Sequence, residues 1–73
     1  MKRLGKVLHV SSSKRLVIVA EANIPIGTQV FDSKLKVVGS VADIFGPVKK
    51  PYVTVKPSVD KPEQYVGQIL YVT

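Results

Sequence analysis

The stretch VGSVADIFGPVKKPYVTVKP, from Val38 to Pro57, decides the fold predicted for this chain. Half of residues 38–45 are β-branched or aromatic, which suits a strand in a pleated, half-buried sheet. Gly46 and Pro47 form a turn signal, because glycine tolerates positive φ and proline restricts φ. Residues 52–56 then alternate polar and apolar side chains, which is typical of a strand with one solvated face. The stretch therefore predicts a β-hairpin.

The loop of this hairpin is more apolar than a solvated turn needs to be. Within nine positions it contains Ile44, Phe45, Pro47, Val48, Pro51 and Tyr52. A solvated hairpin tip normally carries Asn, Asp, Ser and Gly instead. The loop either folds back over its own core or presents a docking surface to a partner. Composition alone favours neither alternative.

Four further segments predict strands, because they are rich in aliphatic and β-branched residues and are bounded by turn residues. They span residues 4–10, 15–20, 29–31 and 68–72. Together with the hairpin they make six short strands, which predicts an all-β fold, a small barrel or sandwich. Leu35 is expected to pack back onto the core between two of these strands.

A single helical turn is expected after the hairpin. Asp60 and Glu63 have the spacing of a capping box, with Asp60 as the N-cap and Pro62 in the first turn. Gly67 is the expected stop, because glycine commonly ends a helix in a left-handed conformation.

The first and last predicted strands have similar sequences. LGKVLHV at residues 4–10 and VGQILYV at residues 66–72 share the pattern apolar-Gly-polar-apolar-Leu-aromatic-Val. A glycine near the start of a strand marks a bend or bulge, which a small barrel needs in order to close. Either the match is a chance similarity of short valine-rich strands, or the two strands have equivalent roles and lie side by side, which removes the open edges of the sheet.

Length and composition predict one domain, residues 1–73, that a partner stabilises. A core of this size supplies only roughly 3–5 kcal/mol without help. The chain has no cysteine for a disulfide or a thiolate metal site. No hydrophobic run approaches the ~20 residues of a membrane-spanning helix, so we expect a cytoplasmic protein without a membrane partner.

The basic charge predicts a polyanion nearby. Eleven basic residues against five acidic ones give a formal net charge of +6. Most of the basic residues are lysines scattered along the sequence, and lysine lacks the bidentate fork of arginine. The charge therefore favours proximity to nucleic acid over readout of its sequence.

The residues form no recognisable catalytic or cofactor site. The five acidic residues are spread singly, and the one histidine, His9, is expected at the surface or rim. The serines that follow it lack the flanking residues of a nucleophile elbow, and neither Gly39 nor Gly46 is followed by a phosphate-loop Gly-Lys-Ser/Thr. We therefore expect a protein that is not an enzyme, with no metal, no cofactor and no small-molecule substrate.

Two binding functions remain for the hairpin loop. Tyr52 is the best candidate for stacking on a nucleic-acid base, because Lys49 and Lys50 are close in sequence. A tyrosine whose ring packs on the protein and whose hydroxyl reaches water is the favoured alternative. For protein docking, residues 45–52 combine apolar anchors with rigid prolines, and the two lysines would form a polar rim.

Three segments of the sequence resemble the archaeal Gar-type protein, the small β-barrel subunit of box H/ACA ribonucleoproteins. They are MKRLGKVLH at residues 1–9, VGSVADIFGPV with PYV at residues 38–48 and 51–53, and YVGQILYV at residues 65–72. The match covers essentially the whole chain. The sequence lacks the glycine-arginine-rich tails of eukaryotic members, so an archaeal origin is expected and no role of those tails is carried over.

The resemblance implies a closed six-stranded β-barrel similar to domain II of translation elongation factors. It also implies a non-catalytic subunit of the guide-RNA complex that makes pseudouridine in ribosomal RNA during ribosome biogenesis. In that family the subunit binds the catalytic domain of the pseudouridine synthase, meets guide and substrate RNA only through the complex, and influences the substrate loop to promote turnover. The residues thereby placed at the interface with the synthase are Phe45, Gly46, Pro47, Val48, Lys49, Pro51, Tyr52 and Val53.

A second function stays open beside this one. The chain could be a free-standing RNA-binding β-barrel related to translation factors. Such a protein would bind short RNA directly, and its affinity would fall steeply with salt because phosphate contacts release counterions.

Overall fold

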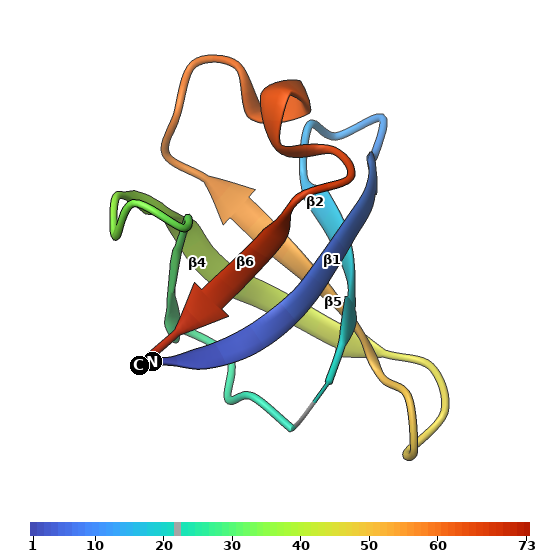
Figure 1. Ribbon diagram of the computed structural model, residues 1–73. Helices are drawn as coiled ribbons and strands as arrows, with labels where there is room; N and C mark the ends of the chain where they lie inside the picture. The colour runs from blue at the N-terminus through green and yellow to red at the C-terminus, as the bar shows by residue number, and fades with distance from the viewer. Residues whose placement is uncertain (22) are drawn as a thin grey trace.

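The structure is a computed structural model that describes residues 1–21 and 23–73. It is built almost entirely of β-strands, with one short 3-10 helix, η1, before the last strand (Figure 1). The elements are β1 (Lys2–Val10), β2 (Leu16–Ala20), β3 (Gln29–Phe31), β4 (Val37–Phe45), β5 (Tyr52–Pro57), η1 (Pro62–Tyr65) and β6 (Ile69–Val72). Each lies where the sequence pattern predicts it, which confirms the all-β fold class.

The strands close into an antiparallel barrel in the order β1-β2-β5-β4-β3-β6. β1 pairs with β2 on one side and with β6 on the other, so the first and last strands lie side by side, as their similar sequences predict. The two ends of the chain consequently lie together (Figure 1). The shortest strand pairing in the barrel is between β3 and β6, where Phe31 is the partner of Tyr71. Closure leaves no long unpaired strand edge.

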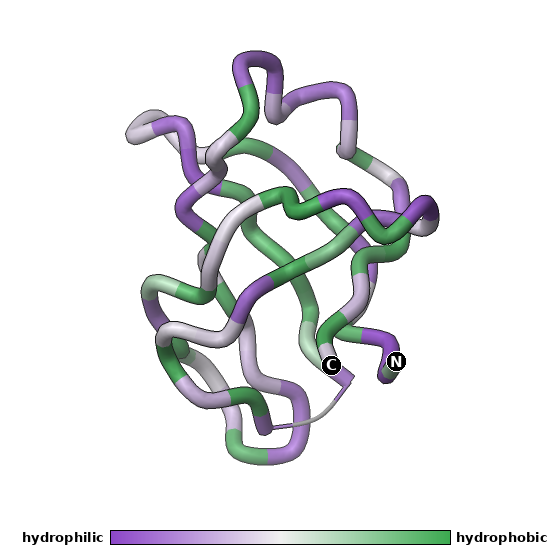
Figure 2. The backbone as a smooth tube through the Cα atoms, turned by 90° about the vertical axis from the view of Figure 1, so that its left-hand side faces the viewer, coloured by the Kyte–Doolittle hydropathy of each residue, from purple (hydrophilic) through white to green (hydrophobic). Residues whose placement is uncertain are grey.

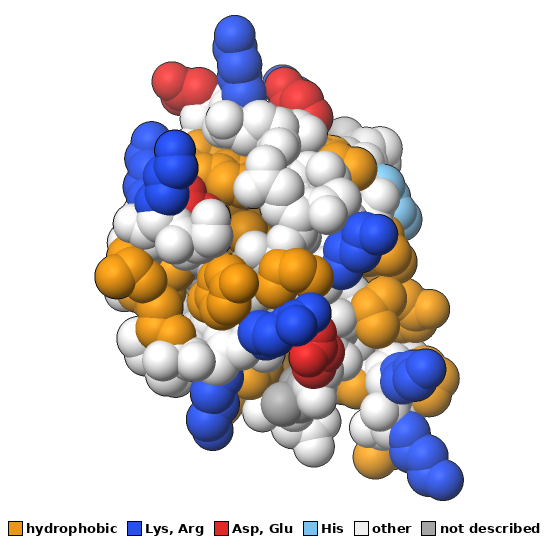
Figure 3. All heavy atoms as spheres, in the orientation of Figure 1, with side chains coloured by type: hydrophobic (Ala, Val, Ile, Leu, Met, Phe, Trp, Pro, Cys, Tyr) orange, Lys and Arg blue, Asp and Glu red, His pale blue; other side chains and the backbone are white. Residues whose placement is uncertain are grey.

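Side chains alternate between the inside and the outside of the barrel. Figure 2 shows hydrophobic and hydrophilic positions following one another along the strands, while the end that carries η1 and the β1–β2 turn is largely hydrophilic. Lysine and arginine side chains project from separate places on the face in Figure 3 rather than from a single patch. Arg3 and Glu21 form an ion pair on the surface, with 3.3 Å between Nη2 and Oε2.

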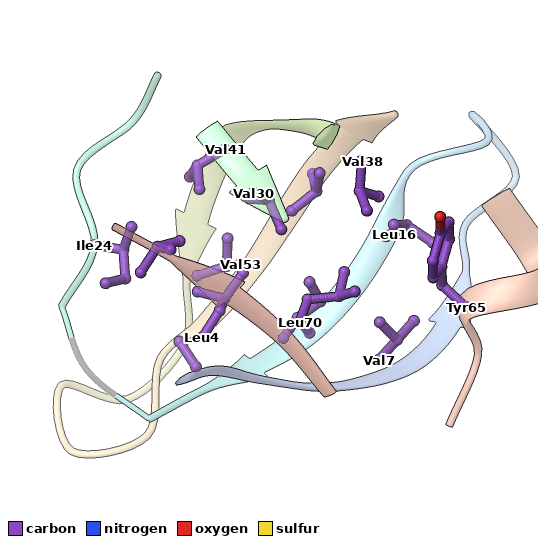
Figure 4. Packing of buried hydrophobic residues seen from close by; sticks show 14 residues of the cluster. Leu4, Val7, Leu16, Ile24, Val30, Val38, Val41, Val53, Tyr65 and Leu70 are labelled. Atoms are coloured by element: carbon purple, nitrogen blue, oxygen red, sulfur yellow. The ribbon is translucent and has the colours of Figure 1, made fainter. Parts of the chain in front are cut away.

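The core is a single cluster of aliphatic side chains (Figure 4). Ile24, in the β2–β3 connection, lies at one end of the cluster and Tyr65 of η1 at the other. Between them, every strand contributes side chains that are completely or almost completely buried: Leu4, Val7, Leu16, Ile18, Val30, Val38, Val41, Val53, Val55, Leu70 and Val72. The apolar residues that alternate with polar ones along the strands therefore face inward and form the core.

Gly5 lets β1 pass close to β2. Its φ is +152°, and a Cβ at this position would collide with the carbonyl oxygen of Val19 on β2. The register of β1 against β6 also shifts between Arg3 and Gly5. The glycine therefore stands at a bend in the strand, as expected for a barrel that closes through β1.

A buried hydrogen bond attaches η1 to the β3–β4 turn. The hydroxyl of Tyr65 donates to Oδ2 of Asp32 at 3.1 Å, and both residues are buried. The other carboxylate oxygen, Oδ1, accepts from the backbone N–H groups of Lys34 at 2.8 Å and Lys36 at 3.0 Å. A buried charge needs such partners, so this carboxylate holds the turn and the helix together.

These contacts also change the protonation of the pair. Burial acts to raise the pKa of Asp32, but the two backbone donors, the Tyr65 hydroxyl and the charge of Lys36 outweigh it, so the pKa lies below its ordinary value. Burial and the hydrogen bond to Asp32 raise the pKa of the Tyr65 hydroxyl. Both shifts favour the arrangement found here, a carboxylate that accepts from a neutral phenol.

Two of the sequence expectations are wrong. Asp60 is not the N-cap of the helix: η1 begins one residue later than expected, Lys61 occupies the N-cap, and none of the described side chains caps it. Leu35 does not pack on the core but is 64% exposed, with φ +66°. The reason is the tight turn that Asp32 organises, which directs Leu35 away from the barrel.

Replacing Gly5 by alanine is expected to destabilise the barrel far more than replacing Gly27 by alanine. Both glycines have positive φ, +152° and +93°, so each alanine introduces backbone strain of roughly 1–3 kcal/mol. At Gly5 the new Cβ also meets the Val19 carbonyl oxygen, whereas none of the described atoms lies within 4 Å of a Cβ at Gly27. Urea unfolding measures the difference, and equal losses would contradict this account of the β1–β2 approach.

Asp32→Asn is expected to lower the stability at neutral pH by about 1.5–3 kcal/mol, because it weakens hydrogen bonds made to a charged acceptor. Since the pKa of Asp32 is depressed in the folded state, its stabilisation is present above the ordinary value of 3.8 and is lost as the pH falls through the lower folded value. The variant should therefore lose less stability than the parent protein on acidification. Asp43→Asn, which changes an exposed carboxylate, is the control for the same series of urea unfolding curves.

Candidate functional site

The loop between β4 and β5 projects from the barrel at the end away from η1 (Figure 1). Its apolar side chains face solvent: Val48 is 87% exposed and Phe45 is 50% exposed, and Ile44 at the end of β4 is also exposed. Figure 3 shows lysine and hydrophobic side chains interleaved at this projection, at the lower right of the view. The loop therefore does not fold back over its own core, which removes one of the two alternatives left open by its composition.

Phe45 and Tyr52 form a stacked pair at the base of the loop. The two residues are direct partners across β4 and β5, and their ring centroids lie 5.5 Å apart with an interplanar angle of 20°. Tyr52 is half-buried. Phe45 therefore lies on the outside of the barrel, supported by Tyr52.

Gly46 allows the loop to turn directly beside this pair. Its φ is +94°, and a Cβ there would come within 2.8 Å of Cδ2 of Tyr52. A side chain at this position would strain the backbone and push the tyrosine ring out of the stack. The absence of a side chain at Gly46 therefore allows both the path of the loop and the stacking of the aromatic pair.

Two of the predicted interface residues anchor the loop rather than face solvent. Pro51 is buried, and its carbonyl oxygen accepts a hydrogen bond from the N–H of Ala20 at 2.9 Å. Val53 is completely buried in the core. Of the other predicted residues, Tyr52 is half-buried and the remaining five are exposed: Phe45, Gly46, Pro47, Val48 and Lys49. The structure thus separates a rigid support from a presented surface.

A hollow of about 490 Å³ lies beside this loop, on the outside of the barrel. Residues of β1, of β2 and its C-terminal end, and of the loop line it: Lys6, Leu8, Val19, Ala20, Glu21, Lys49 and Lys50. Sequence reasoning did not single out Lys6 and Leu8, because nothing local indicates that β1 lies next to the loop. The apolar-Gly-polar-apolar pattern shared by residues 4–7 and 66–69 predicts the bend in β1 and says nothing of the surface beside it.

The described residues offer little for catalysis. In residues 1–21 and 23–73, no group of three or more His, Cys, Asp or Glu side chains is placed to hold a metal ion. His9 is exposed, as predicted. Among the same residues, no helix is long and apolar enough to cross a membrane.

Residues 1–73 match the family model described as the Gar1/Naf1 RNA binding region. The chain belongs to this family. The match extends over the same residues as the resemblance to the archaeal Gar-type protein and confirms it. Membership associates the barrel with RNA and with protein complexes that contain RNA, which agrees with its basic charge.

Two archaeal proteins are similar to this member of the Gar1/Naf1 family. An uncharacterized protein of Methanothermobacter thermautotrophicus is 42% identical over 76 residues, which cover 99% of this chain and 83% of the relative. An uncharacterized protein of Methanocaldococcus jannaschii is 40% identical over 52 residues, covering 71% of this chain and 63% of the relative. Their similarity agrees with membership of one family, but it does not indicate which partner the protein binds.

Alanine substitutions are expected to affect stability differently at the buried residues that support the loop and at its exposed surface. Val53→Ala removes two buried methyl groups from a completely buried side chain and should cost about 2 kcal/mol of unfolding free energy. Val48→Ala changes a side chain that is 87% exposed, so the change should stay within about 0.5 kcal/mol. Urea unfolding of the two variants measures this, and a large loss for Val48→Ala would mean that the loop is packed on the barrel after all.

Proposed function

We propose that this protein is the non-catalytic β-barrel subunit of a box H/ACA guide-RNA pseudouridylation complex. In this proposal residues 1–73 act as one domain that binds the catalytic domain of the pseudouridine synthase through the β4–β5 loop. Membership of the Gar1/Naf1 family supports an RNA-containing complex. The observation that carries the docking contact is the exposed apolar tip of the loop, above all Val48.

The loop has the physical properties of a docking element. Val48 and Phe45 supply apolar anchors, and Lys49 would form part of a polar rim. The Phe45–Tyr52 stack and the fixed φ of Pro47 and Pro51 restrict the conformation of the loop before any partner arrives. A surface that is already ordered loses less entropy on binding, so more of the contact energy appears as affinity.

The barrel would act on the synthase without contributing a catalytic group. A bound subunit shifts the equilibrium between the open and closed states of the substrate loop by the ratio of its affinities for the two states. Tighter binding to either state is sufficient to change the residence of substrate RNA and thereby turnover. This mechanism requires a rigid barrel that makes a specific contact with the synthase. The proposal assigns that contact to the β4–β5 loop. The similar archaeal proteins support an archaeal origin, and the proposal assigns the activity to ribosome biogenesis in the archaeal cytoplasm.

A free-standing RNA-binding barrel is the second candidate, and the family description favours keeping it. The two candidate functions differ in the partner that the isolated protein binds tightly. The docking subunit binds the synthase tightly and RNA weakly, whereas the free-standing barrel binds short RNA tightly without the synthase.

The double substitution Val48→Asp with Tyr52→Ala is expected to weaken binding to the purified synthase domain by roughly 30-fold or more, the effect of losing interface residues worth about 2 kcal/mol. The reason is that a carboxylate replaces an exposed apolar anchor and the support of Phe45 is removed. Isothermal titration calorimetry measures the affinity, and thermal unfolding checks that the barrel is intact.

Leu35→Asp provides the matched control, because it places a carboxylate on another exposed aliphatic position, in the β3–β4 turn. It should leave the affinity for the synthase unchanged. Full affinity of a folded double variant would refute docking through the β4–β5 loop.

A further inference from the structure

The hollow beside the β4–β5 loop has a different character from the loop tip. Three lysines border it: Lys6 of β1, and Lys49 and Lys50 of the loop. Among the described residues that line it, Glu21 is the single acidic one, and its carboxylate is already paired with the guanidinium of Arg3 at 3.3 Å. The hollow therefore presents net positive charge to a ligand.

The strand register continues this basic border into an apolar row. Lys6 is the partner of Val19, Val19 is the partner of Tyr52, and Tyr52 is the partner of Phe45. Partners across neighbouring strands place their side chains on the same face of the sheet. One row on the outside of the barrel thus runs from a lysine over a half-buried valine to the stacked aromatic pair.

A bulge in β1 widens the apolar part of this surface. The register between β1 and β2 shifts between Val7 and His9, so that Leu8 has no partner on β2. Leu8 lies outside the barrel with 43% of its surface exposed, and it lines the hollow together with Val19. An exposed leucine between lysines is not needed for the core, since Val7 already fills the inner position.

We propose that this hollow binds the backbone of a single RNA strand. Lys6, Lys49 and Lys50 contact its phosphates, and the apolar floor of Leu8 and Val19 lies against a sugar or base. A positively charged groove beside a stacking surface is the arrangement by which proteins hold single strands without reading their sequence. Lysine suits this role because it contacts phosphate as a point charge.

This contact goes beyond docking on the synthase. The loop carries the docking tip and also borders the hollow through Lys49 and Lys50, so the barrel can bind a protein with Val48 and an RNA strand with Lys6 and Lys50. Lys49 belongs to both surfaces, being one of the predicted docking residues and part of the border of the hollow. For this reason the test uses the two lysines that are outside the docking residues.

The double variant Lys6→Ala with Lys50→Ala is expected to bind RNA more weakly than the parent protein. The probe is a short fluorescent oligouridine, titrated with the isolated protein at several salt concentrations and followed by fluorescence polarisation. Each phosphate contact to a single strand contributes about 0.7 to the slope of log affinity against log salt. Loss of two contacts should therefore make the slope shallower by about 1.4.

Lys36→Ala with Lys61→Ala is the charge-matched control. It removes the same charge from the hollow lined by Lys36, Val59 and Lys61, which belongs to the β3–β4 turn and the segment before η1. This variant should keep the slope of the parent protein, because it removes no phosphate contact in the proposed site. The loss of net charge is equal in the two variants, so it cancels when they are compared.

Three results would overturn the proposal. The parent protein could fail to bind oligouridine, the two double variants could lose affinity and slope equally, or Lys6→Ala with Lys50→Ala could bind RNA normally while losing affinity for the synthase. The last result would assign the hollow to a protein partner. Because RNA binding is measured without the synthase, failure of this proposal leaves docking through the loop tip intact, and the reverse also holds.

Discussion

Pairing of β1 with both β2 and β6 is the constraint on which the rest of the structure depends. It turns a meandering set of short strands into a closed barrel, and it requires β1 to bend at Gly5, where only a hydrogen fits beneath the Val19 carbonyl. Closure satisfies the backbone groups that an open sheet would expose. It also allows a small cluster of valine, leucine and isoleucine side chains, sealed at its ends by Ile24 and Tyr65, to form the core. A small core leaves little stability to spare, so the buried Asp32–Tyr65 contact and the glycine positions matter more than they would in a larger domain.

A closed barrel of this size leaves function to its loops and outer face. The loop between β4 and β5 is the element that uses this freedom most, because its apolar tip is exposed while its base is held by Pro51, Val53 and the Phe45–Tyr52 stack. Lys49 and Lys50 of the same loop border the basic hollow. The loop therefore contributes to two surfaces. One is apolar and suited to a protein, and the other is basic and suited to phosphate. Membership of an RNA binding family is consistent with a barrel that brings a protein and an RNA strand together.

The candidate site could be predicted only in part. Apolar residues in a loop with Gly46 and Pro47 mark the segment, because such residues are out of place in a solvated turn. The direction of each side chain follows from the barrel instead: Val53 alternates inward and is completely buried, whereas Val48 has no strand pairing and is 87% exposed. The two errors, Leu35 and Asp60, have a similar origin. Each lies in a connection whose path is set by tertiary contacts, the Asp32 turn in one case and the late start of η1 in the other.

The sequence by itself determined the six strands and the turns between them, because period-two alternation, the positive φ open to glycine and the restricted φ of proline act within a few residues. It also determined the family, since the matching segments cover the chain. Only the tertiary structure decided which surface residues are neighbours. Lys6 and Val19 belong to the consecutive strands β1 and β2, and Phe45 and Tyr52 belong to the β4–β5 hairpin. The pairing of β2 with β5 brings these two distant parts of the sequence into one row. The bulge that leaves Leu8 without a partner on β2 likewise lies in the strand that pairs with both β2 and β6.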